Sequence, residues 1–179
     1  MRSPIGADTV RRWAKQLPPC GDVLDVGCGS GVPISAALLE DGFQVFGVDA
    51  SPILVADFRR RFPFAEVACE PVETSGLFQR KFDGAVAIGL LFLLPAEDQR
   101  QVINRVARTL EPGGRFLFSA PRQACEWSDT LTARPSLSLG EAEYRHLLDQ
   151  AGLALSGHFI DEGGNDYFDA VAPLQNTQA

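Results

Sequence analysis

The feature that most constrains the fold is a set of three glycines at alternate positions, Gly27, Gly29 and Gly31, directly after a short apolar stretch. That stretch, residues 23–26, is typical of a buried strand in a parallel sheet. Glycine has no Cβ, so the chain can turn sharply here and a ligand can lie against the backbone. Pro33 then favours the first turn of a helix. A strand that passes through glycines into a helix predicts an α/β nucleotide-binding fold.

The spacing of the glycines narrows the choice of ligand. A dinucleotide-binding loop reads G-x-G-x-x-G and would need glycine at position 32, which is Val32. This departure, with the lack of a catalytic Tyr/Lys or His pattern, disfavours an NAD-dependent oxidoreductase. Asp49 ends the next predicted strand, and an acid at this place can accept hydrogen bonds from both ribose hydroxyls. The sequence therefore predicts an adenosine ligand without requiring a pyrophosphate.

Hydrophobic patterns and helix caps predict the other elements. We expect strands over residues 23–26, 44–48, 65–69, 82–88, 115–119, 153–160 and 167–171. We expect helices over residues 7–17, 33–40, 52–61 and 96–110, and a last helix from the Ser138-x-x-Glu141 capping box to Ala151. Residues 111–114 and 161–166 are expected to be turns.

The segment 120–137 shows no periodicity and is long for a loop in a compact domain. Such loops often bind or cover a ligand, so we predict a lid or substrate-binding segment here. No linker or repeat divides the chain. We therefore expect one domain over residues 1–179, with residues 1–20 forming an N-terminal helix that caps the ligand edge.

Charge and composition argue against several classes of protein. The 179 residues carry a net charge of −7, so no broad basic surface is expected and nucleic-acid binding is disfavoured. The N-terminus has no apolar signal core, and the longest apolar run, residues 85–94, is too short to cross a bilayer. The four cysteines and two histidines show no metal-binding spacing. We expect a cytoplasmic protein with no membrane partner and no metal.

Five motifs in order resemble those of the class I S-adenosylmethionine-dependent methyltransferases. They are V-L-D-V-G-C-G-S-G (23–31), V-F-G-V-D-A-S (45–51), Cys69-Glu70-Pro71, F-D-G-A-V-A-I-G (82–89) and L-E-P-G-G-R-F-L-F (110–118). The resemblance implies a Rossmann-like, doubly wound α/β fold with helices on both faces. Its seven-stranded sheet would have the order 3-2-1-4-5-7-6, with strand 7 antiparallel to the others.

The resemblance also implies how S-adenosylmethionine would bind and leave as S-adenosylhomocysteine. Asp25 and the loop of Gly27, Cys28, Gly29 and Gly31 would hold the methionine moiety, with Ile88 and Gly89 beside it. Asp49 would bind the ribose and Ala50 would pack on adenine. Glu70 would approach the adenine amino group, although Pro71 lacks the backbone N–H that the family often offers next.

The methyl acceptor is less constrained. Strand 4 ends in Ala87-Ile88-Gly89-Leu90, not in the [N/D]-P-P-[Y/F] box of enzymes that methylate base amines or glutamine amides. The apolar tract 90–94 suits an apolar acceptor pocket, or else packs under the following helix. We therefore expect a small-molecule acceptor, with substrate contacts from Trp13, Leu91, Arg122, Trp127 and Asn165. Trp13 has an alternative role as a packing anchor.

Methyl transfer from a sulfonium is an in-line displacement, so the protein chiefly has to position the acceptor, and orientation alone is worth about 7–11 kcal/mol. No set of side chains in the sequence forms a recognisable catalytic arrangement, and Glu162 and Asn165 are the candidates for polar contact with the acceptor.

Two alternatives stay open: a protein or RNA methyltransferase, and a non-catalytic module that binds S-adenosylmethionine. The acceptor atom and the oligomeric state are not determined by the sequence.

Overall fold

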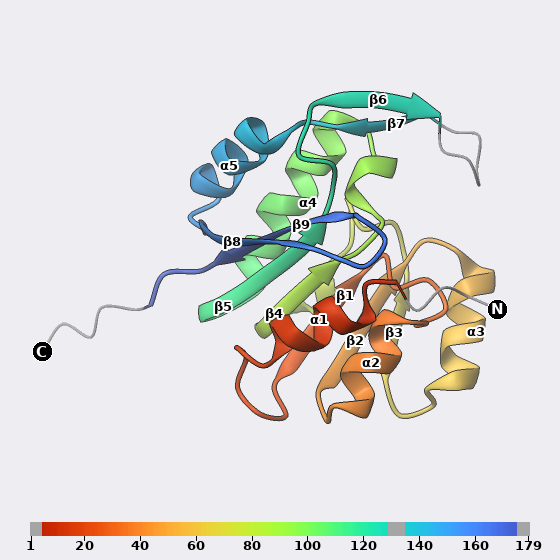
Figure 1. The fold of residues 1–179 in the computed structure, drawn as a ribbon. Coiled ribbons are helices and arrows are strands. Elements are labelled where there is room, and N and C mark those ends of the chain that lie inside the picture. The colour runs from red at the N-terminus through yellow and green to blue at the C-terminus, as the bar shows by residue number, and fades with distance from the viewer. Residues whose placement is uncertain (1–4, 129–134, 175–179) are drawn as a thin grey trace, which may run out of the picture.

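The computed structural model describes residues 5–128 and 135–174, and its main feature is a seven-stranded sheet (Figure 1). Its strands are β1 (Asp22–Val26), β2 (Gln44–Asp49), β3 (Glu66–Cys69), β4 (Phe82–Ala87), β5 (Leu110–Ser119), β8 (Ala154–Ile160) and β9 (Asp166–Val171). Their order is β3-β2-β1-β4-β5-β9-β8, and β9 is antiparallel to both of its neighbours. The predicted fold class and strand order are confirmed.

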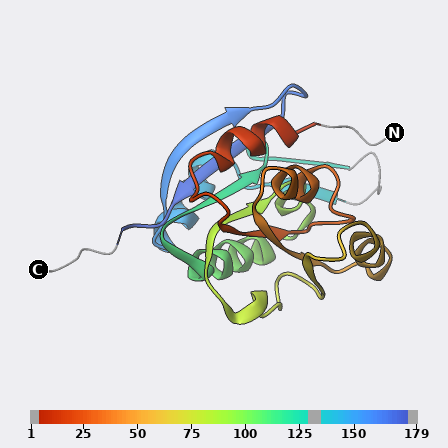
Figure 2. The same ribbon diagram turned by 90° about the horizontal axis from the view of Figure 1, so that it is seen from below.

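Helices cover both faces of the sheet, as predicted (Figure 2). The α-helices are α1 (Ala7–Ala14), α2 (Ile34–Glu40), α3 (Pro52–Arg61), α4 (Ala96–Thr109) and α5 (Glu141–Gln150). Two short 3₁₀ helices, η1 (Leu77–Gln79) and η2 (Leu91–Leu93), were not predicted. None of the helices in the described part of the chain is both long and apolar enough to span a membrane.

Alternation along the strands produces two cores, one on each face of the sheet. In β5, Phe116 and Phe118 belong to the core formed with α4 and α5, while Leu117 belongs to the core formed with α1, α2 and α3. Successive side chains of a strand point to opposite faces, so a strand buried on both sides must be apolar throughout. This is why the central strands read as continuous apolar runs.

One predicted helix start is confirmed and another is wrong. Ser51 caps α3, since its side chain accepts a hydrogen bond from the backbone N–H of Leu54 at 3.4 Å. The capping box at Ser138 does not form, because α5 begins at Glu141 after Gly140. Ser138 instead donates to the carbonyl of Pro121 at 2.6 Å, so its hydroxyl is held by a distant segment.

Two stretches that we expected to be irregular contain strand structure. Segment 120–137 holds β6 (Cys125–Ser128), which pairs antiparallel with β7 (Pro135–Ser138) in a separate two-stranded ribbon beyond the main sheet (Figure 1). Residues 111–114, predicted as a turn, lie within β5, whose register with β4 shifts between Phe82 and Gly84. Pairing with a neighbouring strand, not local periodicity, stabilises both stretches.

Candidate cofactor and acceptor site

The glycine loop lies at the carboxyl ends of β1 and β2, where parallel sheets bind ligands. The backbone N–H groups of Gly27 and Cys28 donate to the carbonyl of Val48 at 2.8 and 3.1 Å. All three glycines have positive φ, at 74° for Gly27, 56° for Gly29 and 80° for Gly31. Side chains with a Cβ rarely adopt this conformation, so the loop shape requires glycine.

The glycines differ in what surrounds them. A Cβ on Gly31 would lie 2.5 Å from Phe62 and 2.8 Å from Phe58, inside the core. A Cβ on Gly29 would meet only Leu54, at 3.9 Å, and would otherwise project into open space. Gly31 is therefore needed for packing, whereas Gly29 leaves room for a ligand.

A cavity of about 280 Å³ opens beside this loop. It is lined by Asp25, Gly27, Cys28, Gly29, Ser30, Val32, Ile34, Leu54 and Ile88. The structure thus brings together five of the residues predicted for cofactor binding. Sequence reasoning missed the apolar wall of Val32, Ile34 and Leu54, although the place of Leu54 in the first turn after Asp49 was a usable signal.

Asp25 is the buried acid of this cavity, with 2% of its surface exposed. It accepts a hydrogen bond from the hydroxyl of Ser35. Burial raises the pKa of Asp25 to about 7; the Ser35 bond opposes this rise and the nearby Asp49 adds to it. A cationic group that enters the cavity would favour the ionised form of Asp25.

Cys28 lines the cavity but its sulfur packs toward β2, since a Cβ on Gly47 would lie 2.7 Å from Sγ. Burial, with Asp25 and Asp49 nearby, raises the pKa of the Cys28 thiol. The thiol is therefore neutral and unreactive, so this residue serves the loop through its backbone.

Asp49 stands at the end of β2 and holds the loop in shape. One carboxylate oxygen accepts from the N–H of Gly29 at 2.9 Å, and the other accepts from the N–H of Ser51 at 2.8 Å. Each oxygen keeps a further lone pair for a ligand hydroxyl. Ala50 follows on the exposed surface.

Glu70 follows β3, next to Asp49 in the sheet, and its N–H donates to the carbonyl of Asp49 at 3.1 Å. The carboxylate of Glu70 accepts a hydrogen bond from the hydroxyl of Ser75. Pro71 is exposed. Contacts of Glu70 and Pro71 with adenine stay predictions, because neither residue lines the cavity beside the glycine loop.

A second cavity, of about 420 Å³, adjoins the first, and the two share Ile88. It is lined by Ile5, Ile88, Gly89, Phe92, Ser119, Ala120, Pro121, Trp127, Gly164, Asn165, Asp166 and Tyr167. We call it the acceptor cavity. Gly89 has a positive φ of 72°, and its N–H donates to the hydroxyl of Ser119 at 2.8 Å. Of the predicted site residues, Ile88, Gly89, Trp127 and Asn165 line this cavity.

The aromatic wall of the acceptor cavity consists of Phe92 and Trp127, whose ring centroids are 5.4 Å apart with 44° between their planes. Phe92 belongs to η2 and Trp127 to β6, and β7 of the same ribbon contacts η2. The segment predicted as a lid therefore supplies an aromatic side chain to the cavity.

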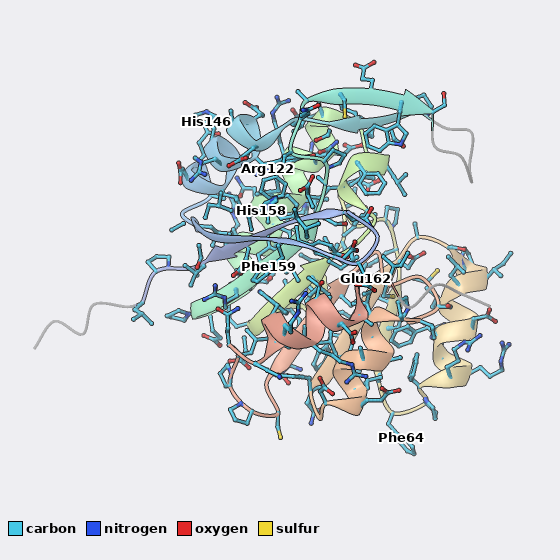
Figure 3. The ribbon with its side chains drawn as sticks, in the orientation of Figure 1. Phe64, Arg122, His146, His158, Phe159 and Glu162 are labelled. Carbon is cyan, nitrogen blue, oxygen red and sulfur yellow. The ribbon has the colours of Figure 1, made fainter. Side chains whose placement is uncertain are left out.

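The turn between β8 and β9 forms the polar side of the acceptor cavity. Asp161 accepts hydrogen bonds from the phenol of Tyr167 at 2.8 Å and from the side-chain amide of Asn165 at 3.0 and 3.1 Å. Burial opposes the ionisation of Asp161, but bonds from Asn165, Tyr167 and Gly163 outweigh it and lower the pKa. Asn165 thus faces the cavity with part of its amide already engaged. Glu162, at the tip of the turn, is exposed and lies outside the residues that line either cavity (Figure 3).

Two of the predicted substrate contacts, Trp13 and Leu91, lie in the core and line neither cavity. Trp13 is fully buried and its indole N–H donates to Asp169 at 3.0 Å, so it is the packing anchor of α1. Leu91 is fully buried in the core under α4, and the next residue, Phe92, faces the acceptor cavity instead. Burial of these large apolar groups removes more apolar area from water than a place on the cavity wall would.

Arg122 lies beside the acceptor cavity and not in it. It lines a separate cavity of about 560 Å³ together with Pro121, Gln123, Cys125, Glu141 and Asp166. The guanidinium forms an ion pair with Glu141, whose Oε2 lies 2.7 Å from Nε of Arg122. The Arg122 pair with Glu141 also lowers the pKa of that carboxyl.

A comparison with known protein families shows to which family the chain belongs. A family model described as a methyltransferase domain matches residues 23–114, just over half of the chain. The chain belongs to the class I S-adenosylmethionine-dependent methyltransferases. The match begins with β1 and the glycine loop and ends within β5, so it covers the strands that form the cofactor side of this methyltransferase site.

Curated relatives agree with this membership. A probable S-adenosylmethionine-dependent methyltransferase of Mycolicibacterium smegmatis is 32% identical over 135 residues, which are 73% of this chain and 51% of the relative. The 18S rRNA (guanine(1575)-N(7))-methyltransferase of Saccharomyces cerevisiae is 29% identical over 112 residues, covering 56% of this chain and 40% of the relative. The chain spans about half or less of the length of these relatives.

Solved structures share the fold. Magnesium protoporphyrin IX methyltransferase from Synechocystis, with bound S-adenosylmethionine, has a TM-score of 0.73 at 21% identity, covering 93% of this chain and 77% of that one. The 1,6-didemethyltoxoflavin-N1-methyltransferase of Burkholderia thailandensis has a TM-score of 0.74 at 22% identity, covering 93% and 76%. At this level of identity the likeness concerns the fold. In the described part of this methyltransferase chain, no group of three or more His, Cys, Asp or Glu side chains is placed to hold a metal ion.

Proposed function

We propose that this chain transfers a methyl group from S-adenosylmethionine to a small-molecule acceptor. The observation that carries the proposal is the junction of the two cavities at Ile88. One cavity lies on the glycine loop and Asp25, and the other has an aromatic wall and a polar turn. A sulfonium methyl held in the first cavity near Ile88 would point at an acceptor held in the second.

The residues of the first cavity suit S-adenosylmethionine by their chemistry. Asp25 is a buried acid that a cationic methionine group would stabilise in its ionised form. Asp49 does not line this cavity but is hydrogen-bonded to Gly29, which does, and it keeps lone pairs for the ribose hydroxyls. The open space over Gly29 admits the ligand close to the backbone. When bound, the cofactor supplies an activated methyl carbon, and the chain positions the acceptor and keeps water away from it.

We further propose that the ribbon of β6 and β7 covers the acceptor. Trp127 reaches the acceptor cavity from this ribbon, while Arg122 and Glu141 form an ion pair near its base. An acceptor would be enclosed between the ribbon, η2 and the turn 161–166. Small acceptors fit an enclosure of about 420 Å³, a size typical of small-molecule sites.

The first experiment is calorimetric titration with S-adenosylmethionine, S-adenosylhomocysteine and, as a control, NAD. Binding of the first two in the micromolar range and none of NAD is expected. Formation of S-adenosylhomocysteine is then measured with fractions of a metabolite extract as the source of acceptor. Cofactor binding with no turnover above the spontaneous rate in any fraction would favour the non-catalytic module, and no cofactor binding would contradict the proposal.

A second candidate acceptor is RNA, because the relative from Saccharomyces cerevisiae is named as an rRNA methyltransferase. The net charge of −7 disfavours it, since RNA affinity normally depends on a basic surface. Total ribosomal RNA, tested in the same turnover assay, separates the two candidates. A cytoplasmic location is a prediction from the sequence.

A further inference from the structure

Asp166 is the one charged residue among the described residues that line the acceptor cavity, and it also lines the neighbouring cavity beside Arg122. The described lining of the acceptor cavity holds no Lys, Arg or His. The rest of the lining is uncharged, with Ser119, Asn165 and Tyr167 as further polar groups. The carboxylate of Asp161 lies behind this lining and accepts hydrogen bonds from Asn165 and Tyr167. A ligand that fills this cavity therefore meets negative charge and no positive charge in the lining.

Backbone contacts hold Asp166 in place. The N–H of Arg122 donates to one carboxylate oxygen at 3.3 Å, and the carbonyl of Asp166 accepts from the N–H of Ala120 at 3.1 Å. Asp166 also begins β9, where it pairs with Ile160. The carboxylate thus sits at a strand end in a set position, which suits a group that orients a ligand.

Arg122 contacts Asp166 through its backbone N–H, but its guanidinium does not neutralise this carboxylate. The guanidinium of Arg122 is directed to Glu141, with which it forms both a hydrogen bond and an ion pair. Arg145, on α5, also pairs with Glu141. Two arginines are thus engaged by one glutamate, and Asp166 has no arginine or lysine partner among the ion pairs of the described chain.

His158, on the neighbouring strand β8, is the other group near this carboxylate. Its Nε2 lies 3.5 Å from Asp166 Oδ1. Burial and the positive charge of Arg122 lower the pKa of His158, and the carboxylates of Asp166 and Glu141 only partly oppose this. The imidazole is therefore neutral near pH 7 and leaves the charge of Asp166 to a ligand. Figure 3 shows Arg122 and His158 in the same region of the molecule.

The geometry points to an acceptor with a basic amine beside a flat apolar group, and we propose that Asp166 binds the amine. This inference rests on the proposed function and names its substrate class. Phe92 and Trp127 offer aromatic faces that favour a flat ring, and they attract a cation as well. A carboxylate acceptor would meet the charge of Asp166 unfavourably, and an alcohol would gain less from it.

The proposed transfer balances as follows. The bound ammonium first gives one proton to Asp166, which passes it to water, and the nitrogen lone pair becomes free. That lone pair forms the new N–C bond while the bond between methyl carbon and sulfur breaks. The bonding electrons stay on sulfur, so S-adenosylhomocysteine leaves uncharged at that atom, and no oxidant or reductant is needed.

Binding to the protein saturated with S-adenosylhomocysteine tests the inference without knowledge of the natural acceptor. The probes are 2-phenylethylamine, 2-phenylethanol and phenylacetate, which share a ring and differ in the polar group. Affinities are measured by ligand-observed NMR. The wild type is expected to bind the amine at least tenfold more tightly than either other probe. Asp166→Asn is expected to remove that preference, because the amide keeps the shape without the charge.

Asp149→Asn, an exposed aspartate on α5 away from both cavities, is the matched control and should keep the preference. Thermal unfolding checks that each variant folds, and Asp166→Ser replaces Asp166→Asn if the latter does not. Equal or tighter binding of the alcohol or acid, no binding of the amine, or an unchanged preference in Asp166→Asn would overturn the inference. Each protein is first titrated with S-adenosylhomocysteine. Loss of that binding in the wild type would count against the proposed function, whereas Asp166→Asn should keep it, because Asp166 does not line the cavity beside the glycine loop.

Discussion

The carboxylate of Asp49 accepts a hydrogen bond of 2.9 Å from the backbone N–H of Gly29. This bond joins the end of β2 to the loop that follows β1, so one acid both shapes the loop and faces the expected place of the ribose. The other oxygen accepts from Ser51 and thereby fixes the start of α3. Loss of Asp49 should affect ligand binding and local structure together.

Asp49→Ala is expected to lower the affinity for S-adenosylmethionine about 100-fold or more, because two hydrogen bonds to a charged group are each worth about 1.5–3 kcal/mol. The free energy of unfolding should fall by about 1–3 kcal/mol, since two backbone N–H groups lose their partner. Calorimetric titration and denaturant unfolding measure the two effects. Asp149→Ala is the control, and wild-type affinity in Asp49→Ala would refute the ribose assignment.

Alanine substitutions at the glycines distinguish positions that leave room for the ligand from positions that are needed for packing of the loop. Gly29→Ala, with φ of 56° and no close contact for the new Cβ, should lose about 1–2 kcal/mol of stability from backbone strain and most of its cofactor affinity. Gly42→Ala is the matched control, because Gly42 has φ of 90°, nothing within 4 Å of its Cβ position, and no place in either cavity.

Gly31→Ala should instead destabilise the chain severely, since its Cβ would lie 2.5 Å from Phe62. Thermal unfolding and titration with S-adenosylmethionine distinguish the three variants. Equal loss of affinity in Gly29→Ala and Gly42→Ala would show that strain, and not the ligand's space, is responsible.

The raised pKa of Asp25, about 7 against an ordinary value of 3.8, predicts a pH-dependent stability. Between these two values the folded chain holds a proton on Asp25 that the unfolded chain has released. As pH rises from about 4 to about 7, the contribution of Asp25 to the free energy of unfolding therefore falls by on the order of 4 kcal/mol. Above about pH 7 this contribution no longer changes with pH.

Asp25→Asn removes this titration, so the stability of the wild type relative to the variant should decline across the same pH range. Urea unfolding at a series of pH values measures the difference. Affinity of the wild type for S-adenosylmethionine should rise from pH 6 to pH 8, because a cationic ligand favours ionised Asp25. A pH-independent difference between the two proteins would contradict the assignment.

Trp127→Ala should weaken acceptor binding while affinity for S-adenosylmethionine stays unchanged, because Trp127 lines the acceptor cavity and not the cavity beside the glycine loop. A loss of one aromatic face should raise the KM for the acceptor about tenfold. Phe64→Ala is the control, since Phe64 is fully exposed and lines neither cavity. Figure 3 shows its side chain projecting away from the rest of the molecule. Parallel loss of cofactor affinity in Trp127→Ala would show that the ribbon supports the whole site instead.

The strand order and most element bounds were predictable, because apolar runs, proline and glycine act locally and the methyltransferase motifs carry the topology. Ser51-Pro52 predicted the start of α3 for this reason. The Ser138 capping box failed because the carbonyl of Pro121 takes its hydroxyl, and that contact has no local signal. The strands of the ribbon were missed because each is short and is stabilised by pairing and by contact with η2.

The sequence by itself determined the cofactor side: the turn at Gly27, Gly29 and Gly31 and the acid at the end of β2 follow from local backbone requirements and from strand order. Only the tertiary structure decided the acceptor side, because η2, the β6–β7 ribbon and the turn 161–166 meet there from distant parts of the chain. Packing turned Trp13 and Leu91 into the core and left Phe92, Trp127 and Asp166 facing the cavity. Which of two neighbouring apolar side chains is buried depends on the shape of the opposing surface, and a single sequence does not contain that shape in readable form.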